Sequence, residues 1–324
     1  MSKSNPNVLL PTLYTPATTE VEKLISQANG YGTASRMVFC CEDSIDRSDE
    51  PEALANLEEV FKRLDPEIPT DVFVRVRIDA DIKNDMLERV LSMAGVENIT
   101  GIVIPKADPD TYPTSATLIS QADADLRVMP ILESEGMYDC EFRKDLRDVF
   151  MDPRHYNDID CLRLGAYDLM GYQNLMKDKY SSVWDYAVIE TVLSNIICEF
   201  GRGGAFTITA PVFGDYGKQY NAIFRRQTAT SMRNGLFGQT VIHPQHVPQL
   251  KEMYKVTADE LLDAQAILDK DAKGAQGRDG RMLEKAVMTG AAKRIMERSR
   301  LFGVLTDIRQ SPHNQEELAK MVDS

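Results

Sequence analysis

Acidic and basic side chains follow successive apolar runs at regular intervals along this 324-residue sequence. Asp43, Arg77, Lys106, Glu133 and Asp168 are separated by 34, 29, 27 and 35 residues. Each interval is about the length of one strand-and-helix unit, so we expect the five groups to meet at one end of a set of parallel strands. A charged residue that simply begins a loop is the plainer interpretation of any single position, but it does not explain the whole series.

Two of these carboxylates suggest a metal site. Glu133 and Asp168 would follow neighbouring strands, and Mg²⁺ usually takes one or two carboxylates together with waters and substrate oxygens. Arg77 offers a planar fork that fits a carboxylate or an enolate oxygen. Together these groups suit a reaction that forms an enolate next to a carbonyl. The alternative for the two carboxylates is a surface salt bridge or a helix N-cap.

Proton transfer in such a reaction needs a base. Asp43 and Asp215 are the best candidates, and Glu42 could orient a metal-bound water. The adjacent Cys40 and Cys41 must point to opposite faces of a strand, so only one of them can face the interior of a barrel. We expect both thiols to be buried and inert.

The elements that must position these residues can be read from the hydrophobic pattern. Eight apolar, β-branched runs alternate with amphipathic helical patterns, which predicts a (β/α)8 TIM barrel. A doubly wound sheet is the rival, but no GxGxxG turn follows the first run. The predicted strands are Val8–Tyr14, Met37–Cys41, Val72–Ile78, Ile99–Pro105, Arg127–Leu132, Cys161–Gly165, Phe206–Val212 and Gly235–Ile242.

Helical patterns continue after the eighth run, over residues 244–254, 258–272 and 280–302. They predict a C-terminal helical extension of the barrel. We therefore expect a catalytic domain at residues 1–253 and a helical extension with a polar tail at residues 254–324. The Gly-rich segment 273–280 is expected to be a mobile loop between two of these helices.

Composition narrows the classes of partner. Lys plus Arg is 37 and Asp plus Glu is 50, a net charge of −13, which disfavours binding to nucleic acid or to anionic membranes. The sequence contains no apolar stretch of about 18 residues, so we expect no transmembrane helix. The first residues also lack the apolar region of a signal peptide. The five cysteines form no CxxC pair. A reducing, cytoplasmic setting is the expectation.

Six segments resemble, in order, the motifs of the citrate lyase β-subunit-like family, a group related to HpcH/HpaI aldolases that includes malyl-CoA and citryl-CoA lyases. The similarity extends from about Met37 to Val247. Phe39-Cys-Cys-Glu-Asp43 resembles D-L-E-D, Val76-Arg77-Ile-Asp79 resembles V-R-V-N, and Gly101-Ile-Val-Ile-Pro-Lys106 resembles G-I-V-L-P-K. Pro130-Ile-Leu-Glu133-Ser134 resembles P-L-I-E-T, and Arg163-Leu-Gly-Ala-Tyr-Asp168-Leu169 resembles the segment with G-A-x-D-L. Gly235-Leu-Phe-Gly238-Gln-Thr-Val-Ile-His243-Pro244-Gln245 resembles G-F-x-G-K-x-x-I-H-P-x-Q.

The resemblance implies a (β/α)8 barrel, often in homotrimers or larger assemblies, and a reversible carbon–carbon cleavage of a β-hydroxy acid or its thioester. It implies Mg²⁺ at Glu133 and Asp168. It also implies that Arg77 holds the oxo acid and polarises its oxygen. The remaining implied substrate contacts are Lys106, Gly165 and Ala166.

Departures from the motifs bear on the substrate. Cys40 and Cys41 replace the first two motif residues of D-L-E-D, Asp79 replaces an asparagine, and Gln239 replaces a lysine. The loss of a cation weakens the case for coenzyme A. The substrate is therefore expected to be a small carboxylic acid, with an acyl-CoA still open. An aldolase acting on a free 2-oxo acid and a non-catalytic barrel subunit of a larger complex remain as alternatives.

Overall fold

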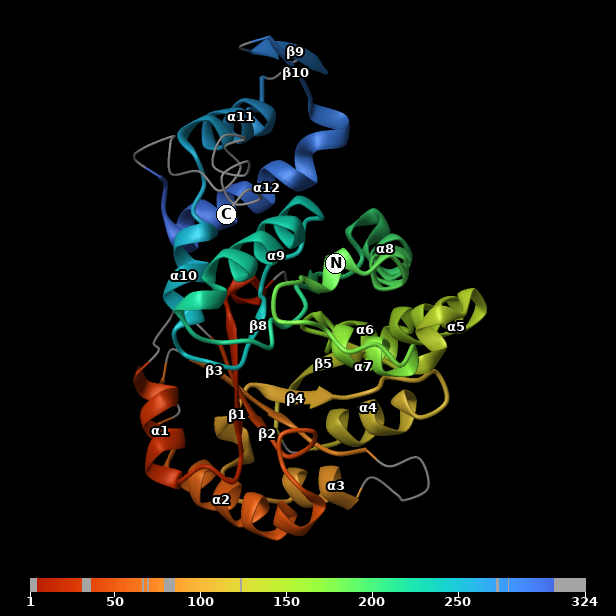
Figure 1. The fold of residues 1–324 in the computed structure, drawn as a ribbon, viewed down its shortest axis with the longest axis vertical. Coiled ribbons are helices and arrows are strands. Elements are labelled where there is room, and N and C mark those ends of the chain that lie inside the picture. Colours follow the sequence, from red (N-terminus) through yellow and green to blue (C-terminus); the bar gives the residue numbers. More distant parts are fainter. Residues whose placement is uncertain are drawn as a thin grey trace. The chain divides into compact units, whose positions relative to one another are not determined.

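Eight parallel strands form the centre of the chain in a computed structural model, which describes residues 5–30, 36–65, 67–68, 70–78, 85–122, 124–271, 274–278 and 280–305. Figure 1 shows their arrangement. The strands are β1 (Thr12–Pro16), β2 (Arg36–Cys40), β3 (Asp71–Arg75), β4 (Gly101–Ile104), β5 (Arg127–Leu132), β6 (Leu162–Leu164), β7 (Ile208–Thr209) and β8 (Thr240–Val241).

The strands close into a barrel. They lie in the order β7-β6-β5-β4-β3-β2-β1-β8, and every neighbouring pair is parallel. Isolated bridges from Thr209 to Phe237 and from Phe213 to Val241 then join the β7 side to the β8 side. This arrangement confirms the predicted (β/α)8 TIM barrel.

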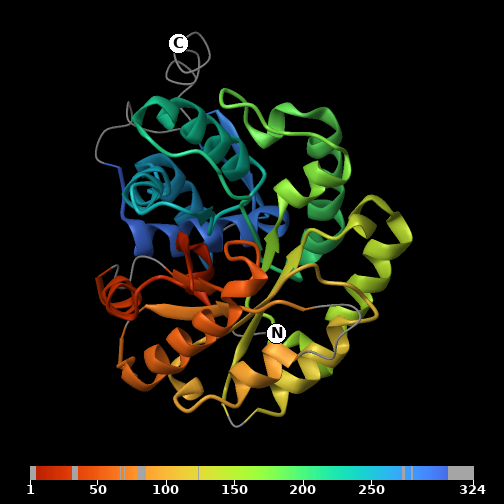
Figure 2. The ribbon, with the colours of Figure 1, turned by 60° about the horizontal axis from the view of Figure 1, so that its bottom comes forward.

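Helices surround the strands of this barrel (Figure 2). Their buried faces supply the apolar cover that a parallel sheet needs: in the second helix, for example, Leu54, Leu57, Val60 and Phe61 are all buried. The helices are α1 (Val21–Gly30), α2 (Glu50–Arg63), α3 (Asp85–Leu91), α4 (Tyr112–Ser120), α5 (Cys140–Met151), α6 (Pro153–Tyr156), α7 (Ala166–Tyr172), α8 (Ala187–Gly201) and α9 (Asn221–Arg233).

The first strand lies later in the sequence than predicted. The apolar run suggested Val8–Tyr14, but β1 covers Thr12–Pro16, and Pro6–Leu9 forms a 3₁₀ turn instead. The Asn5 side chain accepts a hydrogen bond from the backbone N–H of Asn7 at 3.1 Å, and Pro6 occupies the start of the turn. An N-cap and a proline at this position favour a helical turn over a strand, so local chemistry outweighed the hydrophobic run.

A buried ion-pair network lies at the amino ends of the strands. Arg36 begins β2, and its Nη2 lies 2.6 Å from Oδ2 of Asp160, while its Nε lies 3.1 Å from Oδ2 of Asp71 at the start of β3. The side chains of Arg36 and Asp160 are fully buried. This network ties together three strand segments at the end of the barrel opposite their carboxyl ends.

The chain divides into two compact units, Met1–Val247 and Pro248–Ser324. Helix α10 (His246–Met253) spans this division. The expected domains, residues 1–253 and 254–324, stay a prediction. The described part of the second unit contains α11 (Ala258–Leu268), β9 (Ala275–Arg278), β10 (Arg281–Glu284) and α12 (Lys285–Phe302).

The second unit has a small core of its own. Ala264, Ile267, Leu283 and Ala292 pack together from its two long helices and from β10. The Gly-rich segment expected to be a loop contributes to an antiparallel hairpin, in which β9 pairs with β10. The expectation of helices on either side of this segment is confirmed, and the hairpin is an addition to it.

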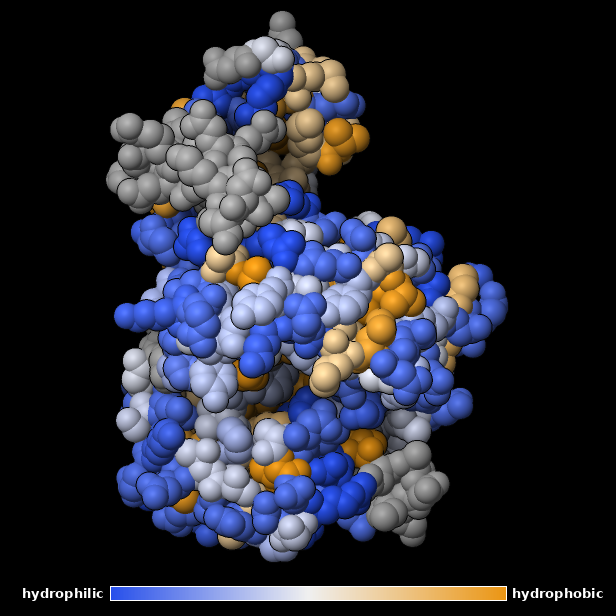
Figure 3. All heavy atoms as spheres, viewed as in Figure 1, coloured by the Kyte–Doolittle hydropathy of each residue, from blue (hydrophilic) through white to orange (hydrophobic). Residues whose placement is uncertain are grey.

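Figure 3 shows a mostly hydrophilic face with a narrow hydrophobic band. Across the described residues, none of the helices combines the length and the apolar composition that crossing a bilayer requires.

Candidate active site

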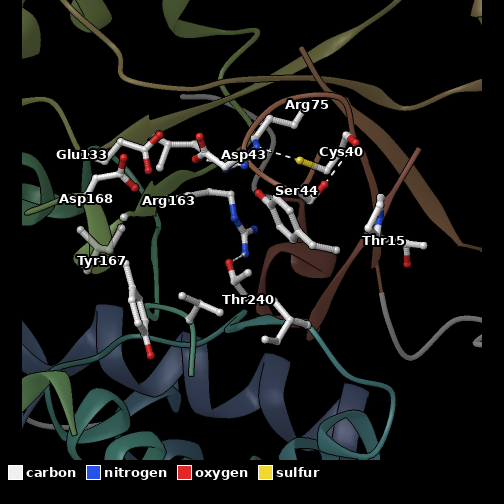
Figure 4. Close-up of a pocket in the computed structure, with 17 residues that line it drawn as sticks. Thr15, Cys40, Asp43, Ser44, Arg75, Glu133, Arg163, Tyr167, Asp168 and Thr240 are labelled. Carbon is white, nitrogen blue, oxygen red and sulfur yellow. Dashed lines mark hydrogen bonds and ion pairs between the residues drawn. The ribbon is translucent and has the colours of Figure 1, made fainter. Parts of the chain in front are cut away.

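A cavity of about 420 Å³ opens within the barrel, and this volume lies in the range of ordinary small-molecule sites. It receives side chains from the strands and from the residues that directly follow them (Figure 4). Its polar lining is Tyr14, Thr15, Cys40, Asp43, Ser44, Arg75, Glu133, Arg163, Tyr167, Asp168 and Thr240. The groups that follow β2, β5 and β6 place the reactive part of this cavity at the carboxyl ends of the strands.

Glu133 and Asp168 lie beside each other on one side of the cavity (Figure 4). Glu133 directly follows β5 and is only 2% exposed, while Asp168 lies in the first turn of α7. Burial, with the neighbouring Asp168 charge as the second cause, raises the pKa of Glu133 to about 8. At neutral pH the metal-free protein therefore keeps a proton on Glu133.

The position of Glu133 depends on close approach of the backbone. A Cβ atom added at Gly165 would lie 2.1 Å from Oε2 of Glu133 and 2.4 Å from its Cβ, so only glycine fits there. On the other side, the backbone N–H of Lys106 donates to Oε1 of Glu133 at 3.1 Å. The segments after β4 and β6 thus hold the carboxylate from two sides.

Arg75 is the last residue of β3, and its guanidinium faces two carboxylates. Its Nη2 lies 2.8 Å from Oε2 of Glu42 and 3.2 Å from Oδ2 of Asp43, and its Nε donates to Sγ of Cys40 at 3.2 Å. Burial disfavours the charged form, but the nearby Cys40, Glu42 and other acidic groups outweigh it and raise the pKa of Arg75. Arg75 therefore stays charged in the cavity wall.

Lys106 joins the acidic groups on both sides of the cavity. Its Nζ lies 3.0 Å from Oε1 of Glu42, 3.7 Å from Oδ1 of Asp43 and 3.4 Å from Oδ1 of Asp168. Its φ of 47° is uncommon for a residue with a side chain and costs on the order of 1 kcal/mol. This conformation directs its backbone N–H to Glu133 and its ammonium to the other three carboxylates.

The two acidic residues after β2 differ in their environments. Burial raises the pKa of Glu42, whose carboxylate also accepts the backbone N–H of Asp43 at 2.9 Å. Burial also opposes ionisation of Asp43, but its hydrogen bond with Glu42 and the Arg75 and Lys106 charges outweigh burial and lower its pKa. Asp43 lines the cavity with a half-exposed side chain and is ionised at neutral pH.

The family model for carbon–carbon bond lyases of the TIM-barrel fold matches residues 5–304. The chain belongs to this family. In a search of curated proteins, no sequence matched this lyase.

Solved structures with the same fold include two citrate lyase proteins. One is the CitE protein of Mycobacterium tuberculosis in complex with magnesium, acetoacetate and coenzyme A: 20% identity, TM-score 0.64, covering 90% of this chain and 98% of that one. Another is a citrate lyase from Burkholderia xenovorans: 14% identity, TM-score 0.70, covering 94% and 95%. RipC from Yersinia pestis has 15% identity and a TM-score of 0.57, covering 79% and 99%.

The predicted site residues fall into two groups in this lyase. The cavity brings together Asp43, Glu133, Gly165 and Asp168, and Glu42 and Lys106 form ion pairs with groups that line it. Ala166 is buried and is not among the described residues that line the cavity. Asp79, which replaces the asparagine of the V-R-V-N motif, lies outside the residues that the structure describes.

Arg77 does not take the position expected of it. Its Nε lies 2.7 Å from Oε1 of Glu50 on α2, its Nη2 donates to the backbone oxygen of Glu42 at 3.1 Å, and the described lining of the cavity does not include it. Strand β3 ends at Arg75, so the alternation that would place both arginines on one face stops before Arg77. The geometry thus gives Arg75 the position that the sequence suggested for Arg77.

Asp215 is likewise outside the described cavity lining. Its Oδ2 lies 2.5 Å from Nζ of Lys177, whose side chain is almost fully buried. An ion pair of this kind positions the segment after β7 and leaves Asp215 poorly placed to accept a proton from a substrate in the cavity.

The sequence pattern assigned no role to several polar cavity residues, among them Tyr14, Thr15, Ser44, Arg163, Tyr167 and Thr240. A signal was present for one of them, because Arg163 interrupts the apolar run Cys161–Gly165. A charged residue in the middle of a buried strand needs a partner or a function, and a barrel lumen is the place where it can have one.

The donor set fits a magnesium ion. Glu133 and Asp168 are oxygen ligands close enough for one charge to raise the pKa of the other, and a divalent cation between them would relieve that repulsion. Among the described residues, no group of three or more His, Cys, Asp and Glu side chains is arranged to hold a metal. A two-carboxylate site that is completed by water and substrate oxygens is the arrangement that Mg²⁺ commonly takes.

Proposed function

We propose that this lyase is a Mg²⁺-dependent enzyme that cleaves or forms a β-hydroxy acid through an enolate. The observation that supports it best is the juxtaposition of the Glu133–Asp168 pair with the buried Arg75 guanidinium around one cavity. Fold relatives agree with this proposal: a citrate lyase β subunit of Mycobacterium tuberculosis was crystallised with oxaloacetate and magnesium. That chain shares 20% identity with this one and has a TM-score of 0.55.

Glu133 and Asp168 would hold the metal. Bound there, Mg²⁺ supplies a Lewis acid that polarises substrate oxygens. Glu133 must lose its proton to become a ligand, and the Lys106 backbone N–H and ammonium remain in place to orient the two carboxylates. The buried position of Glu133 and its contact with Gly165 fix the direction in which its carboxylate points.

Arg75 would stabilise the negative charge that develops on the enolate oxygen. Its side chain is held by Glu42, Asp43 and Cys40 before any substrate arrives, so little reorganisation is needed during the reaction. A guanidinium can donate two hydrogen bonds in one plane to a carboxylate or enolate. The role that the sequence suggested for Arg77 thus passes to Arg75.

Asp43 would accept the proton from the substrate hydroxyl in the cleavage direction. It is ionised, lines the cavity and lies next to Arg75, whereas Asp215 is engaged with Lys177. Glu42 is placed to orient Arg75 and Lys106 through its two oxygens. These assignments give each carboxylate a different task in the same site.

The substrate would be a small carboxylic acid rather than a coenzyme A thioester. Of the cations that could meet nucleotide phosphates, Arg36 is buried with Asp160 at the far end of the strands, and Lys106 is paired with carboxylates. Lys218 is exposed, but a single lysine is weak support for a phosphate site. The coenzyme A in the Mycobacterium tuberculosis complex belongs to that relative.

Enolate formation can be tested without knowing the full substrate. Incubation with pyruvate and MgCl₂ in D₂O should exchange the methyl protons of pyruvate, which NMR follows directly. Glu133→Gln, Asp168→Asn and Arg75→Lys should each slow this exchange by about 10²-fold or more. Arg77→Lys is the matched control, because it makes the same change two residues away and outside the cavity.

Two results would contradict the proposal. One is exchange in the wild type that does not depend on Mg²⁺. The other is an Arg77→Lys variant that loses as much activity as Arg75→Lys, which would return the role to Arg77 or show a general structural effect.

A further inference from the structure

Arg163 crosses the interior of the barrel from β6 and lines the cavity (Figure 4). It is only 1% exposed, although arginine is almost never fully buried without a partner. No carboxylate among the described residues lies within ion-pair distance of its guanidinium. Arg75 and Lys106, the other cations of the site, both have carboxylate partners.

Neutral groups hold the Arg163 guanidinium in a fixed position. Its Nη1 donates to Oγ1 of Thr12 at 3.2 Å, and its Nη2 donates to the backbone oxygen of Gly238 at 3.3 Å and to Oγ1 of Thr240 at 2.5 Å. The Nη1 group also lies 3.6 Å from Sδ of Met129. These contacts orient the side chain without neutralising its charge.

One donor of this guanidinium is left over. The Nε–H of Arg163 is buried and has no hydrogen-bond partner among the described residues. The ring of Tyr14, which also lines the cavity, lies 5.5 Å from the guanidinium carbon. Burial raises the pKa of the Tyr14 hydroxyl against the opposing effect of Arg163, so at neutral pH this hydroxyl keeps its proton and can donate.

We infer that Arg163 binds a second carboxylate of the substrate, remote from the reacting carbons, and so selects dicarboxylic acids. A buried charge without a counter-ion is costly, and a carboxylate in the cavity would supply the missing negative charge and accept the free Nε–H. The inference deepens the proposed function, on which it rests for the reacting end of the substrate at Glu133, Asp168 and Arg75.

The geometry favours two separate anion positions. Glu133 and Asp168 lie along one side of the cavity, while the Arg163 guanidinium points away from them toward Thr240 (Figure 4). A group bound at Arg163 is therefore distinct from oxygens bound at the acidic pair. One carboxylate balances one unpaired guanidinium, whereas a phosphate would bring additional negative charge into a cavity that already holds several carboxylates.

Matched pairs of 2-oxo acids test this inference by calorimetry on the full chain with excess MgCl₂. 2-Oxoglutarate and 2-oxopentanoate differ only by a terminal carboxylate against a methyl group, and oxaloacetate and 2-oxobutanoate form the same pair one carbon shorter. In at least one pair the dicarboxylate should bind about 10- to 100-fold more tightly. Arg163→Gln should abolish this preference, and Arg163→Lys should retain part of it.

Controls separate recognition from folding. Arg143→Gln removes a buried guanidinium on α5 that donates to the backbone of Met137 outside the described cavity lining, and it should keep the preference. Circular dichroism should show that Arg163→Gln is folded. If it is not, Thr240→Val provides a milder change that loosens the guanidinium and should weaken the preference in part.

The pyruvate exchange assay distinguishes failure of this inference from failure of the proposed function. Pyruvate lacks a second carboxylate, so its exchange by the wild type reports on the proposed chemistry without requiring the site at Arg163. Exchange that proceeds normally while the wild type shows no dicarboxylate preference, or while Arg163→Gln keeps that preference, overturns the role of Arg163. Failure of both acids of each pair to bind also overturns it. Absence of exchange together with an Arg163-dependent preference overturns the proposed chemistry alone.

Discussion

Replacement of Gly165 by alanine should disable the acidic pair through a single methyl group. The added Cβ would lie 2.1 Å from Oε2 and 2.4 Å from Cβ of Glu133, more than 1 Å inside an ordinary contact. Glu133 is almost fully buried and cannot simply move into solvent. The backbone of Gly165 has a negative φ, so the change introduces no backbone strain and its effect comes from this overlap alone.

The size of the effect follows from the displacement required. Overpacking of a buried site costs about 1–3 kcal/mol, which corresponds to a melting temperature lower by several degrees for a unit of this size. A catalytic group displaced by about 1 Å can cost about 10²-fold in rate. We therefore expect Gly165→Ala to lower Tm moderately, weaken Mg²⁺ binding in calorimetry and slow pyruvate exchange by about two orders of magnitude.

Gly171→Ala is the matched control in the same helix. Nothing lies within 4 Å of the Cβ it would introduce, so it should keep full activity and stabilise the helix by about 0.5–1 kcal/mol. If Gly165→Ala kept wild-type Mg²⁺ affinity and exchange rate, the contact between Gly165 and Glu133 would not control the position of the carboxylate.

Three further predictions concern pH, stability and coenzyme A. Burial and Asp168 raise the pKa of Glu133 from 4.5 to about 8, so between these two pH values the folded chain keeps a proton that the unfolded chain has lost. The metal-free unfolding free energy should therefore fall as the pH rises from about 4.5 to about 8, by up to roughly 1.4 kcal/mol per pH unit, and urea titrations should show a smaller fall in Glu133→Gln. Asp160→Ala would leave the buried Arg36 with only Asp71, which is partly exposed, as its ion-pair partner. The free energy of unfolding in urea should therefore fall by about 3–5 kcal/mol. Pyruvate exchange per folded molecule should not change, because the Arg36–Asp160 pair lies at the amino ends of the strands. Coenzyme A should leave Tm unchanged under conditions in which Mg²⁺ raises it, and a clear rise with coenzyme A would refute the preference for free acids.

The alternation of apolar runs and helical patterns determined the barrel. Seven of the eight predicted runs overlap their strands closely in position, because a strand covered by helices on its outer face must be apolar along its length. The exception was β1, where Asn5 and Pro6 stabilise a turn in the first half of the apolar run. A hydrophobic pattern reports burial, and a buried 3₁₀ turn satisfies it as well as a strand does.

The acidic half of the site was also readable from the sequence. Asp43, Glu133 and Asp168 directly follow strands or begin the next helix, and in a closed parallel barrel all such positions share one end. Chain connectivity alone therefore brings them together, whatever the details of packing. Their proposed roles in metal binding and proton transfer rest on this placement and stay predictions.

Tertiary structure alone decided the cationic half. Arg75 and Arg77 are equivalent in an alternating pattern, and only the end of β3 and the position of Glu50 on α2 send one into the cavity and the other away from it. Arg163 shows the same limit, because a sequence reveals a charged residue within a strand but not the neutral partners on β1 and β8 that hold it. Partners of this kind lie more than 70 residues away along the chain, and their distance in space is set by barrel closure, which no local pattern encodes.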